Sequence, residues 1–294
     1  MPNERPDLLP TPVHRFQLGQ FEVTTILDGA QRRDGISPPF GIDQDECVVS
    51  ALARDNKLPV HAFENTFTPT LVNTGKELVL FDTGNGASRR SSGAGFLRNR
   101  LSLAGYKPED VDIVAFTHMH PDHINGVWEG DQPAYPNARY VMGQREFDVW
   151  SKGDAIPERR ADNRALFLRL ISPLAEEMTF LAPGNDIAGG IRAVEAFGHS
   201  LGHMAYMIES DGKALLIWGD VTNHYALSLQ RPDWHAAMDD DRVLAVTTRK
   251  RILDMVATDN LLAIGHHMPF PAVGYVERMG GAYRWLPLTY QLKV

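Results

Sequence analysis

The residues best suited to chemistry lie in one short segment, Thr117-His118-Met119-His120-Pro121-Asp122-His123. Its three imidazoles and one carboxylate are ligand types that suit zinc and similar divalent metals. His118 and His120 are two residues apart, so in an extended loop they share one side. Asp122 and His123 follow one turn later and can face a second ion. A surface loop can carry a single histidine by chance, but this grouping directly after an apolar stretch predicts a metal site.

Further candidate ligands follow other apolar stretches that are typical of strands. The predicted strands cover residues 111–116, 191–197, 214–218 and 261–264. Each ends directly before a polar motif, and these motifs contribute His118, His199, Asp220 and His267. Because loops at strand ends carry chemistry on a rigid base, we expect these side chains to converge.

The elements that must position them alternate along the chain without repeats or a flexible linker. Further strands are predicted over residues 21–27 and 138–142, and hairpins over 70–81 and 204–218 around the turns at 74–76 and 211–212. Helical patterns cover residues 95–104, 144–151, 158–177 and 239–258. The stretch around Cys47 is typical of an ordinary helix or strand.

Composition narrows the classes of protein. The chain has 294 residues, eleven histidines, one cysteine and a formal net charge of -8. A single cysteine excludes an internal disulfide and a thiolate-rich metal site. The acidic balance disfavours nucleic acid as a partner, because neutralising phosphates needs clustered Lys and Arg. No apolar run reaches the ~18 residues that span a bilayer. We therefore expect no membrane association.

Four prolines near the start predict an extended N-terminal arm over residues 1–15, followed by a single catalytic domain over residues 16–294. The first residues lack the basic and apolar pattern of a signal peptide. A cytoplasmic location is therefore expected, or a periplasmic one where a signal peptide has been removed.

The motifs together resemble the metallo-β-lactamase superfamily. His118-Met119-His120-Pro121-Asp122-His123 resembles its signature, Gly198-His199-Ser200-Leu201-Gly202-His203 its G-H-x-x-G-H element, and Asp82-Thr83-Gly84 its early D-T-G. The resemblance covers residues 63–276 and implies an α+β fold, an αββα sandwich with two β-sheets packed between outer helices. The C-terminal stretch around His267-Met268-Pro269-Phe270-Pro271 is similar to the branch of methyl parathion hydrolase and acyl-homoserine lactonases.

This resemblance implies a full set of ligands for two divalent ions, most simply zinc, with manganese, iron or cobalt as alternatives. One ion is expected on His118, His120 and His199, and the other on Asp122, His123 and His267, with Asp220 bridging both. Asp122 and Asp220 are accordingly the catalytic carboxylates. Asp82 and His203 are expected to support the ligands from behind. His266 is expected there too, although it competes with His267 for the last ligand position.

The implied reaction is hydrolysis of a lactone or ester, in which a metal-bridging hydroxide attacks the carbonyl. A phosphotriesterase side activity is also expected. In many acyl-homoserine lactonases a tyrosine follows the bridging aspartate by three residues, and here Asn223 stands in its place. The expected substrate pocket, which favours small hydrophobic substrates, is lined by Phe40, Phe63, Trp128, Trp150, Asn223, His224 and Phe270.

Alternative activities are an organophosphate hydrolase acting mainly on aryl phosphotriesters, and a β-lactamase-like amide hydrolase. A nuclease, a flavo-diiron protein and a non-catalytic metal-binding module fit less well, because the chain is acidic, has His120 where the flavo-diiron proteins carry Glu, and has an apparently complete ligand set. Relatives of this branch are commonly dimers, so a homodimer is expected.

Overall fold

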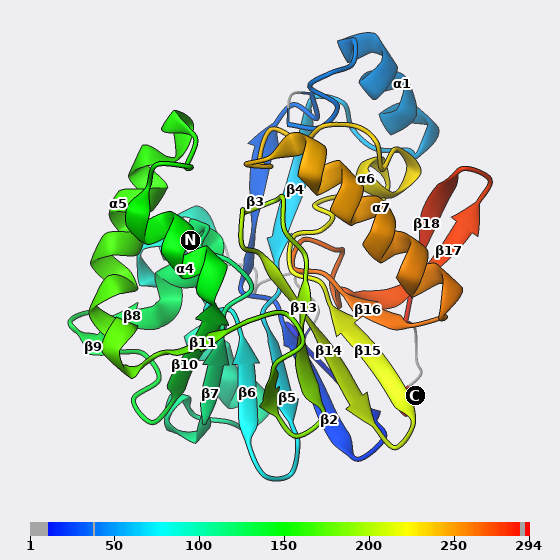
Figure 1. The fold of residues 1–294 in the computed structure, drawn as a ribbon. Coiled ribbons are helices and arrows are strands. Elements are labelled where there is room, and N and C mark those ends of the chain that lie inside the picture. Colours follow the sequence, from blue (N-terminus) through cyan, green and yellow to red (C-terminus); the bar gives the residue numbers. More distant parts are fainter. Residues whose placement is uncertain (1–10, 38, 289–291) are drawn as a thin grey trace, which may run out of the picture.

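The computed structural model describes residues 11–37, 39–288 and 292–294. Within them two seven-stranded sheets face each other, and helices cover the outer face of each (Figure 1). The strand orders are β1-β2-β5-β6-β7-β10-β11 in the first sheet and β12 to β18 in sequence in the second. This arrangement confirms the αββα sandwich.

The first sheet consists of β1 (Val13–Leu18), β2 (Phe21–Ile26), β5 (Thr70–Asn73), β6 (Leu78–Phe81), β7 (Ile113–Ala115), β10 (Arg139–Gly143) and β11 (Thr179–Leu181). The second consists of β12 (Asp186–Ala188), β13 (Ile191–Glu195), β14 (Met204–Ser210), β15 (Lys213–Ile217), β16 (Leu262–Ile264), β17 (Val273–Met279) and β18 (Ala282–Pro287). Two short ribbons lie outside them, β3 (Gly29–Asp34) with β4 (Ala62–Phe67) and β8 (Trp128–Glu129) with β9 (Gln132–Pro133).

The α-helices are α1 (Glu46–Asp55), α2 (Leu97–Arg100), α3 (Pro121–Ile124), α4 (Gln144–Lys152), α5 (Ala161–Leu170), α6 (Leu227–Gln230) and α7 (Arg242–Thr258). Short 3-10 helices cover Ala87–Ser92, Leu101–Ala104, Pro108–Asp110, Asn125–Val127, Glu158–Arg160 and Ser172–Glu177. None of the helices in the described part of the chain is both long and apolar enough to cross a bilayer.

Alternation of side chains explains why the central strands are apolar on both faces. In β6, Val79 and Phe81 enter the core between the sheets, whereas Leu78 and Leu80 pack under the outer helices. In β15, Leu215 and Ile217 enter the shared core and Leu216 packs under α7. Strands covered on both faces are read as continuous apolar runs, which is the pattern in the sequence.

Strand direction brings the ends of the site-bearing strands together. β6, β7 and β10 run parallel in the first sheet. In the second sheet β13 and β15 both run antiparallel to β14, and β16 runs parallel to β15. The carboxyl ends of β13, β15 and β16 therefore lie at one edge, and the loops that follow them meet the loop after β7.

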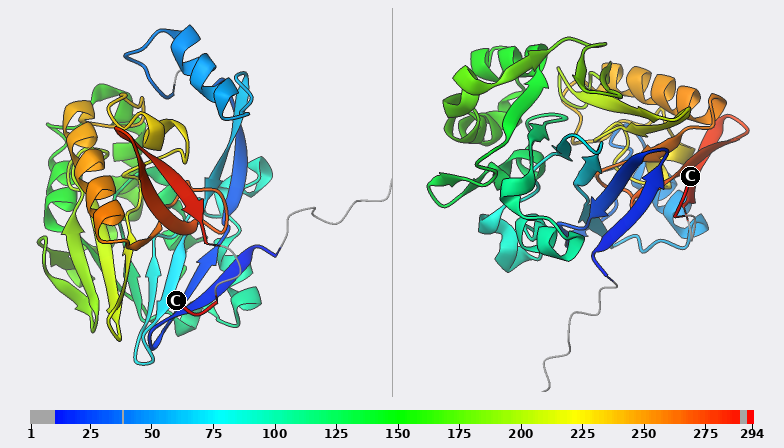
Figure 2. Two further views of the ribbon diagram at one scale, coloured as in Figure 1. Left: turned by 90° about the vertical axis from the view of Figure 1, so that its right-hand side faces the viewer. Right: turned by 90° about the horizontal axis from the view of Figure 1, so that it is seen from below.

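A separate unit, formed by the β3–β4 ribbon and α1, extends beyond the sandwich (Figures 1 and 2). It has a small apolar cluster of its own around Ile36, Phe40 and Val49, into which Leu227 and Trp234 also pack. Cys47 is exposed on α1. The ribbon and the helix stand beside the metal-site edge, where they can form a wall.

Three predicted elements differ from the structure. The helix expected over residues 95–104 is divided into α2 and a 3-10 turn, and the helix expected over 158–177 keeps only α5 as α-helix between 3-10 segments. Pro173 lies in the first turn of the last segment, where a proline is tolerated. Residues 13–15 of the expected arm belong to β1 and pair with β2, while residues 1–10 lie outside the described residues.

Candidate metal centre

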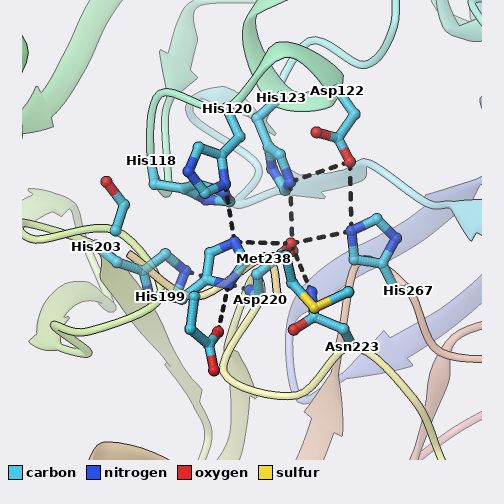
Figure 3. A network of polar contacts seen from close by, with 12 residues as sticks. His118, His120, Asp122, His123, His199, His203, Asp220, Asn223, Met238 and His267 are labelled. Atoms are coloured by element: carbon cyan, nitrogen blue, oxygen red, sulfur yellow. Dashed lines mark hydrogen bonds and ion pairs between the residues drawn. The ribbon is translucent and has the colours of Figure 1, made fainter. Parts of the chain in front are cut away.

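Four loops at the shared edge carry the predicted ligands. His118 and His120 follow β7, and Asp122 and His123 lie in the adjoining helix α3. The other three lie in loops that follow strands of the second sheet: His199 after β13, Asp220 after β15 and His267 after β16. All seven side chains point toward one another (Figure 3). The structure therefore brings together every predicted ligand.

The first group is His118, His120 and His199, whose ligand atoms all lie within 4.8 Å of one another. Nδ1 of His120 is 2.9 Å from Nε2 of His199. All three rings are almost completely buried. Three converging imidazoles are an arrangement that divalent ions such as zinc occupy.

The second group is Asp122, His123 and His267, which also meet within 4.8 Å. His267 Nε2 is 3.3 Å from the Asp122 carboxylate, and His123 Nε2 is 3.8 Å from it. Asp220 lies between the groups: its oxygens are 2.9 Å from His267 Nε2, 3.3 Å from His123 Nε2 and 3.3 Å from His199 Nε2. It can therefore bridge two ions.

The hydrogen bonds of the outer ring nitrogens fit a metal-binding role. Outer nitrogens of His118, His123 and His267 contact the Thr117 hydroxyl at 3.0 Å, the Asp82 carboxylate at 2.8 Å and the Thr66 carbonyl at 2.8 Å. An outer N–H held this way leaves the inner nitrogen as a lone pair. Among the described residues, the buried Nε2 atoms of His118 and His123 have no hydrogen-bond partner. The residues present therefore fit two divalent ions.

The electrostatics of the centre also favour bound cations. Burial lowers the pKa of His267, but Asp220 and Asp122 outweigh it and raise the pKa to about 10. Burial also lowers the pKa of His123, but Asp220, Asp82 and Asp122 outweigh it and hold that pKa well above its usual value. The pKa of His118, by contrast, is well below its usual value, through burial and the neighbouring imidazoles. The clustered carboxylates of Asp82, Asp122 and Asp220 thus favour nearby positive charge, which metal ions would supply in place of protons.

The residues expected behind the ligands occupy such positions. Asp82, in the left-handed region at φ 61°, accepts hydrogen bonds from the Thr117 backbone and hydroxyl as well as His123. His203 donates through Nδ1 to a backbone carbonyl, and its Nε2 accepts from the Asp220 N–H at 3.2 Å. His266 packs its ring 4.0 Å from that of His123, whereas the Nε2 of His267 faces both Asp220 and Asp122.

Sequence reasoning did not identify three buried carboxylates near the centre. Asp239 contacts His199 Nδ1 at 2.9 Å, and Asp240 contacts His120 Nε2 at 3.2 Å. Glu146 of α4 accepts from both the loop after β7 and the loop after β13. The available signals were a run of three aspartates at the start of one predicted helix and a glutamate on the apolar side of another.

A cavity of about 370 Å³ opens on the ligands, and a second of about 340 Å³ adjoins it. They share Phe63, Asn65, Asn223 and His267. The second cavity extends to His224 and Phe270. These cavities contain four of the predicted wall residues, namely Phe63, Asn223, His224 and Phe270.

The other three predicted wall residues lie elsewhere. Phe40 packs behind the wall, 5.5 Å from the Phe63 ring and 5.2 Å from the His224 ring. Trp128 borders a separate surface cavity and donates to the carbonyl of Leu170. Trp150 is fully buried, one helical turn after Glu146, to which its indole N–H donates. Trp150 of α4 therefore belongs to the core and does not line the cavity.

Comparison with known proteins supports this picture. The sequence model of the metallo-beta-lactamase superfamily matches residues 68–267. An N-acyl homoserine lactonase of Bacillus cereus is 22% identical over 167 residues, covering 56% of this chain and 60% of that protein. The chain spans about three fifths of the length of the curated relatives that it matches.

Two solved structures share the whole fold. One is AidC, described as a dizinc quorum-quenching lactonase in complex with a product, with a TM-score of 0.88, 24% identity and coverage of 95% of this chain and 98% of that one. The other is the hydrolase AbOPH of the beta lactamase superfamily, with a TM-score of 0.88, 26% identity and coverage of 96% and 99%.

Proposed function

The chain belongs to the metallo-beta-lactamase superfamily, and from this premise we propose that it is a two-metal hydrolase of lactones or esters. The observation that carries the proposal is Asp220, which contacts histidines of both ligand groups. A carboxylate placed between two ligand groups can bind two ions at once. The activity named for the relatives, hydrolysis of N-acyl homoserine lactones, suggests a lactone as the substrate.

In the proposed site His118, His120 and His199 would hold one ion and Asp122, His123 and His267 the other, and Asp220 would be shared by both. Two such ions would lower the pKa of a shared water toward neutrality and polarise the oxygen of the substrate. All seven donors are nitrogen or oxygen, which suits zinc and also manganese, iron or cobalt. We propose zinc as the resident metal.

The chain's own residues would orient the substrate. Asn223 donates to Asp220 at 2.9 Å, and its buried side-chain oxygen has no partner among the described residues. Because Asn223 borders both cavities, that oxygen can accept a hydrogen bond from a bound substrate. The aromatic wall at Phe63 would pack against the apolar part of the same molecule.

His224 is a candidate donor in the second cavity. Its Nδ1 accepts hydrogen bonds from the backbone N–H groups of Ala226 and Leu227, and burial lowers the pKa of the ring to about 4. The ring is therefore neutral at pH 7, with its proton on Nε2. A neutral imidazole beside an apolar cavity suits an uncharged substrate better than an anionic one.

A substrate panel tests the proposal. It contains lactones with short and long acyl chains, aryl esters, an aryl phosphotriester and a chromogenic β-lactam, assayed with protein loaded with zinc. We expect lactones to be hydrolysed fastest, with weaker turnover of aryl esters and the phosphotriester. If the phosphotriester is hydrolysed fastest, the protein is mainly an organophosphate hydrolase. If the β-lactam is hydrolysed fastest, it is an amide hydrolase.

A variant pair assigns the activity to the centre. Asp220→Ala should abolish turnover of every substrate, because no other carboxylate among the described residues contacts both ligand groups. Asp131→Asn, at an exposed turn between β8 and β9, is the matched control and should leave turnover unchanged. Full activity of Asp220→Ala would contradict the proposal.

A further inference from the structure

Three consecutive aspartates precede α7, and two of them stand behind ligands of one proposed ion. Asp239 Oδ1 accepts from His199 Nδ1 at 2.9 Å, and Asp240 Oδ2 accepts from His120 Nε2 at 3.2 Å. In both rings the opposite nitrogen is the one that faces the metal centre. Each aspartate thus fixes which nitrogen carries the proton and how the ring is turned.

An arginine holds each of these aspartates in turn. Arg249 donates to Asp239 Oδ2 at 2.7 Å, and both side chains are almost completely buried. Arg160 donates through Nε to Asp240 Oδ1 at 2.8 Å. Paired and hydrogen-bonded carboxylates stay ionised inside a protein and make strong acceptors. The two imidazoles therefore face fixed negative charge.

The backbone fixes the same segment against the ligand loop. The N–H of Asp240 donates to the carbonyl of His199, and the N–H of Asp241 to that of Gly198, both at 3.0 Å. The side chain of Asp241 caps α7. Gly198 has φ 131°, and a Cβ there would lie 2.3 Å from the Ala245 backbone nitrogen, so only glycine allows this close approach.

The second group of ligands is supported differently. His123 also faces a carboxylate, Asp82, whereas the outer nitrogen of His267 contacts the backbone carbonyl of Thr66 and no carboxylate in the described part of the chain. The histidine group at His120 and His199 thus has two aspartates from one segment, and the other group has one from the loop after β6. Removing one of the aspartates that precede α7 should therefore weaken the binding of the ion at the three-histidine group more than that of the other ion.

We propose that Asp239 and Asp240 are positioning residues that hold His199 and His120 and thereby set the affinity of the ion bound by the three-histidine group. This inference rests on the two-metal site of the proposed function, but not on the identity of the substrate. Residues that orient metal-binding histidines typically contribute about 10- to 100-fold in metal affinity.

The test measures zinc binding rather than turnover. Wild-type protein and the variants Asp239→Asn, Asp240→Asn and Asp241→Asn are equilibrated in buffers of known free Zn²⁺, and the bound zinc per chain is determined. Asp241→Asn is the matched control, because asparagine caps a helix nearly as well as aspartate. The urea midpoint of each metal-free protein is measured alongside. Asp239→Asn leaves the buried Arg249 without its carboxylate partner and could prevent folding, in which case Asp240→Asn decides the result.

We expect two bound ions in the wild type and in Asp241→Asn. In Asp239→Asn and Asp240→Asn, half-occupancy of one ion should need about 10- to 100-fold more free Zn²⁺. The other ion should shift less, and in Asp240→Asn the urea midpoint should stay near that of the control. Wild-type binding curves in both variants, or equal weakening of both ions, would overturn the inference. A wild type that binds two ions yet hydrolyses no lactone or ester would overturn the proposed function alone.

Discussion

Glu146→Gln is the substitution that best tests how the ligand loops are held together. Glu146 is 1% exposed, and its Oε1 accepts hydrogen bonds from the Met119 N–H at 2.9 Å, the Trp150 indole at 2.9 Å and the Ser200 hydroxyl at 2.6 Å. Its Oε2 accepts from the Gly202 N–H at 2.8 Å. One carboxylate therefore connects the loop of His118 and His120 to that of His199.

The magnitude follows from these bonds. Glutamine keeps one oxygen, so its amide NH₂ would face the Gly202 N–H and leave that buried donor unpaired, at a cost of about 1–3 kcal/mol. The other bonds lose the assistance of the charge, which is worth roughly 1 kcal/mol each. Burial, partly offset by the hydrogen bonds from Ser200, Met119 and Gly202, raises the pKa of Glu146, so removing the buried charge returns some free energy. The net loss of unfolding free energy should be about 2–4 kcal/mol.

Urea unfolding of the metal-free protein measures this loss. Glu129→Gln is the control, because Glu129 pairs with Arg90 at 3.1 Å where both side chains are about one-third exposed, so the change should cost under about 1 kcal/mol. Zinc affinity should also fall in Glu146→Gln, since both loops carry ligands. An unfolding free energy within about 0.5 kcal/mol of the wild type would refute the reasoning, because that is the scatter typical of surface substitutions.

Three other changes have defined outcomes. A strong chelator should abolish turnover and lower the melting temperature, and added zinc should restore both; unchanged melting would show that the ions do not connect the two sheets. For His224 the native ring stays neutral down to pH about 4 while the unfolded ring takes up a proton near pH 6.5, so stability should fall by about 3 kcal/mol as the pH drops through this window. His224→Asn should lose that part of the pH dependence in urea titrations. Phe63→Ala should raise the KM for long-chain lactones about tenfold, corresponding to lost apolar burial, and leave short-chain ones unchanged; an equal change for both would contradict the pocket assignment.

The proposed metal ligands could be identified in the sequence because their pattern is local. His118, His120, Asp122 and His123 fall in one segment after an apolar strand, and the family resemblance built on them is confirmed by the superfamily match. The two-sheet fold is confirmed as well. A residue directly after a strand has its position fixed by the sheet, so short motifs at strand ends largely determine where their side chains lie.

The supporting carboxylates could not be predicted, because their contacts are remote in sequence. Asp239 is 40 residues from His199, and Asp240 is 120 residues from His120. In the sequence these aspartates are typical of a helix start, which is the role that only Asp241 fulfils. Trp150 has the residue type of a pocket wall, but its position on α4 turns it inward, and one sequence does not distinguish the two.

The β3–β4 ribbon and α1 have a consequence for how such a protein can change over evolutionary time. This unit has its own apolar cluster and supplies Phe63 and Asn65 to both cavities, yet it contains none of the seven proposed ligands. Apart from the backbone at Thr66, whose carbonyl contacts His267, mutations in residues 29–67 can therefore reshape this part of the wall without removing a proposed ligand. In the proposed function, part of the surface that would select a substrate is thus encoded apart from the residues that would hold the ions, so selection or engineering can alter that part of the wall and keep the ligand set intact.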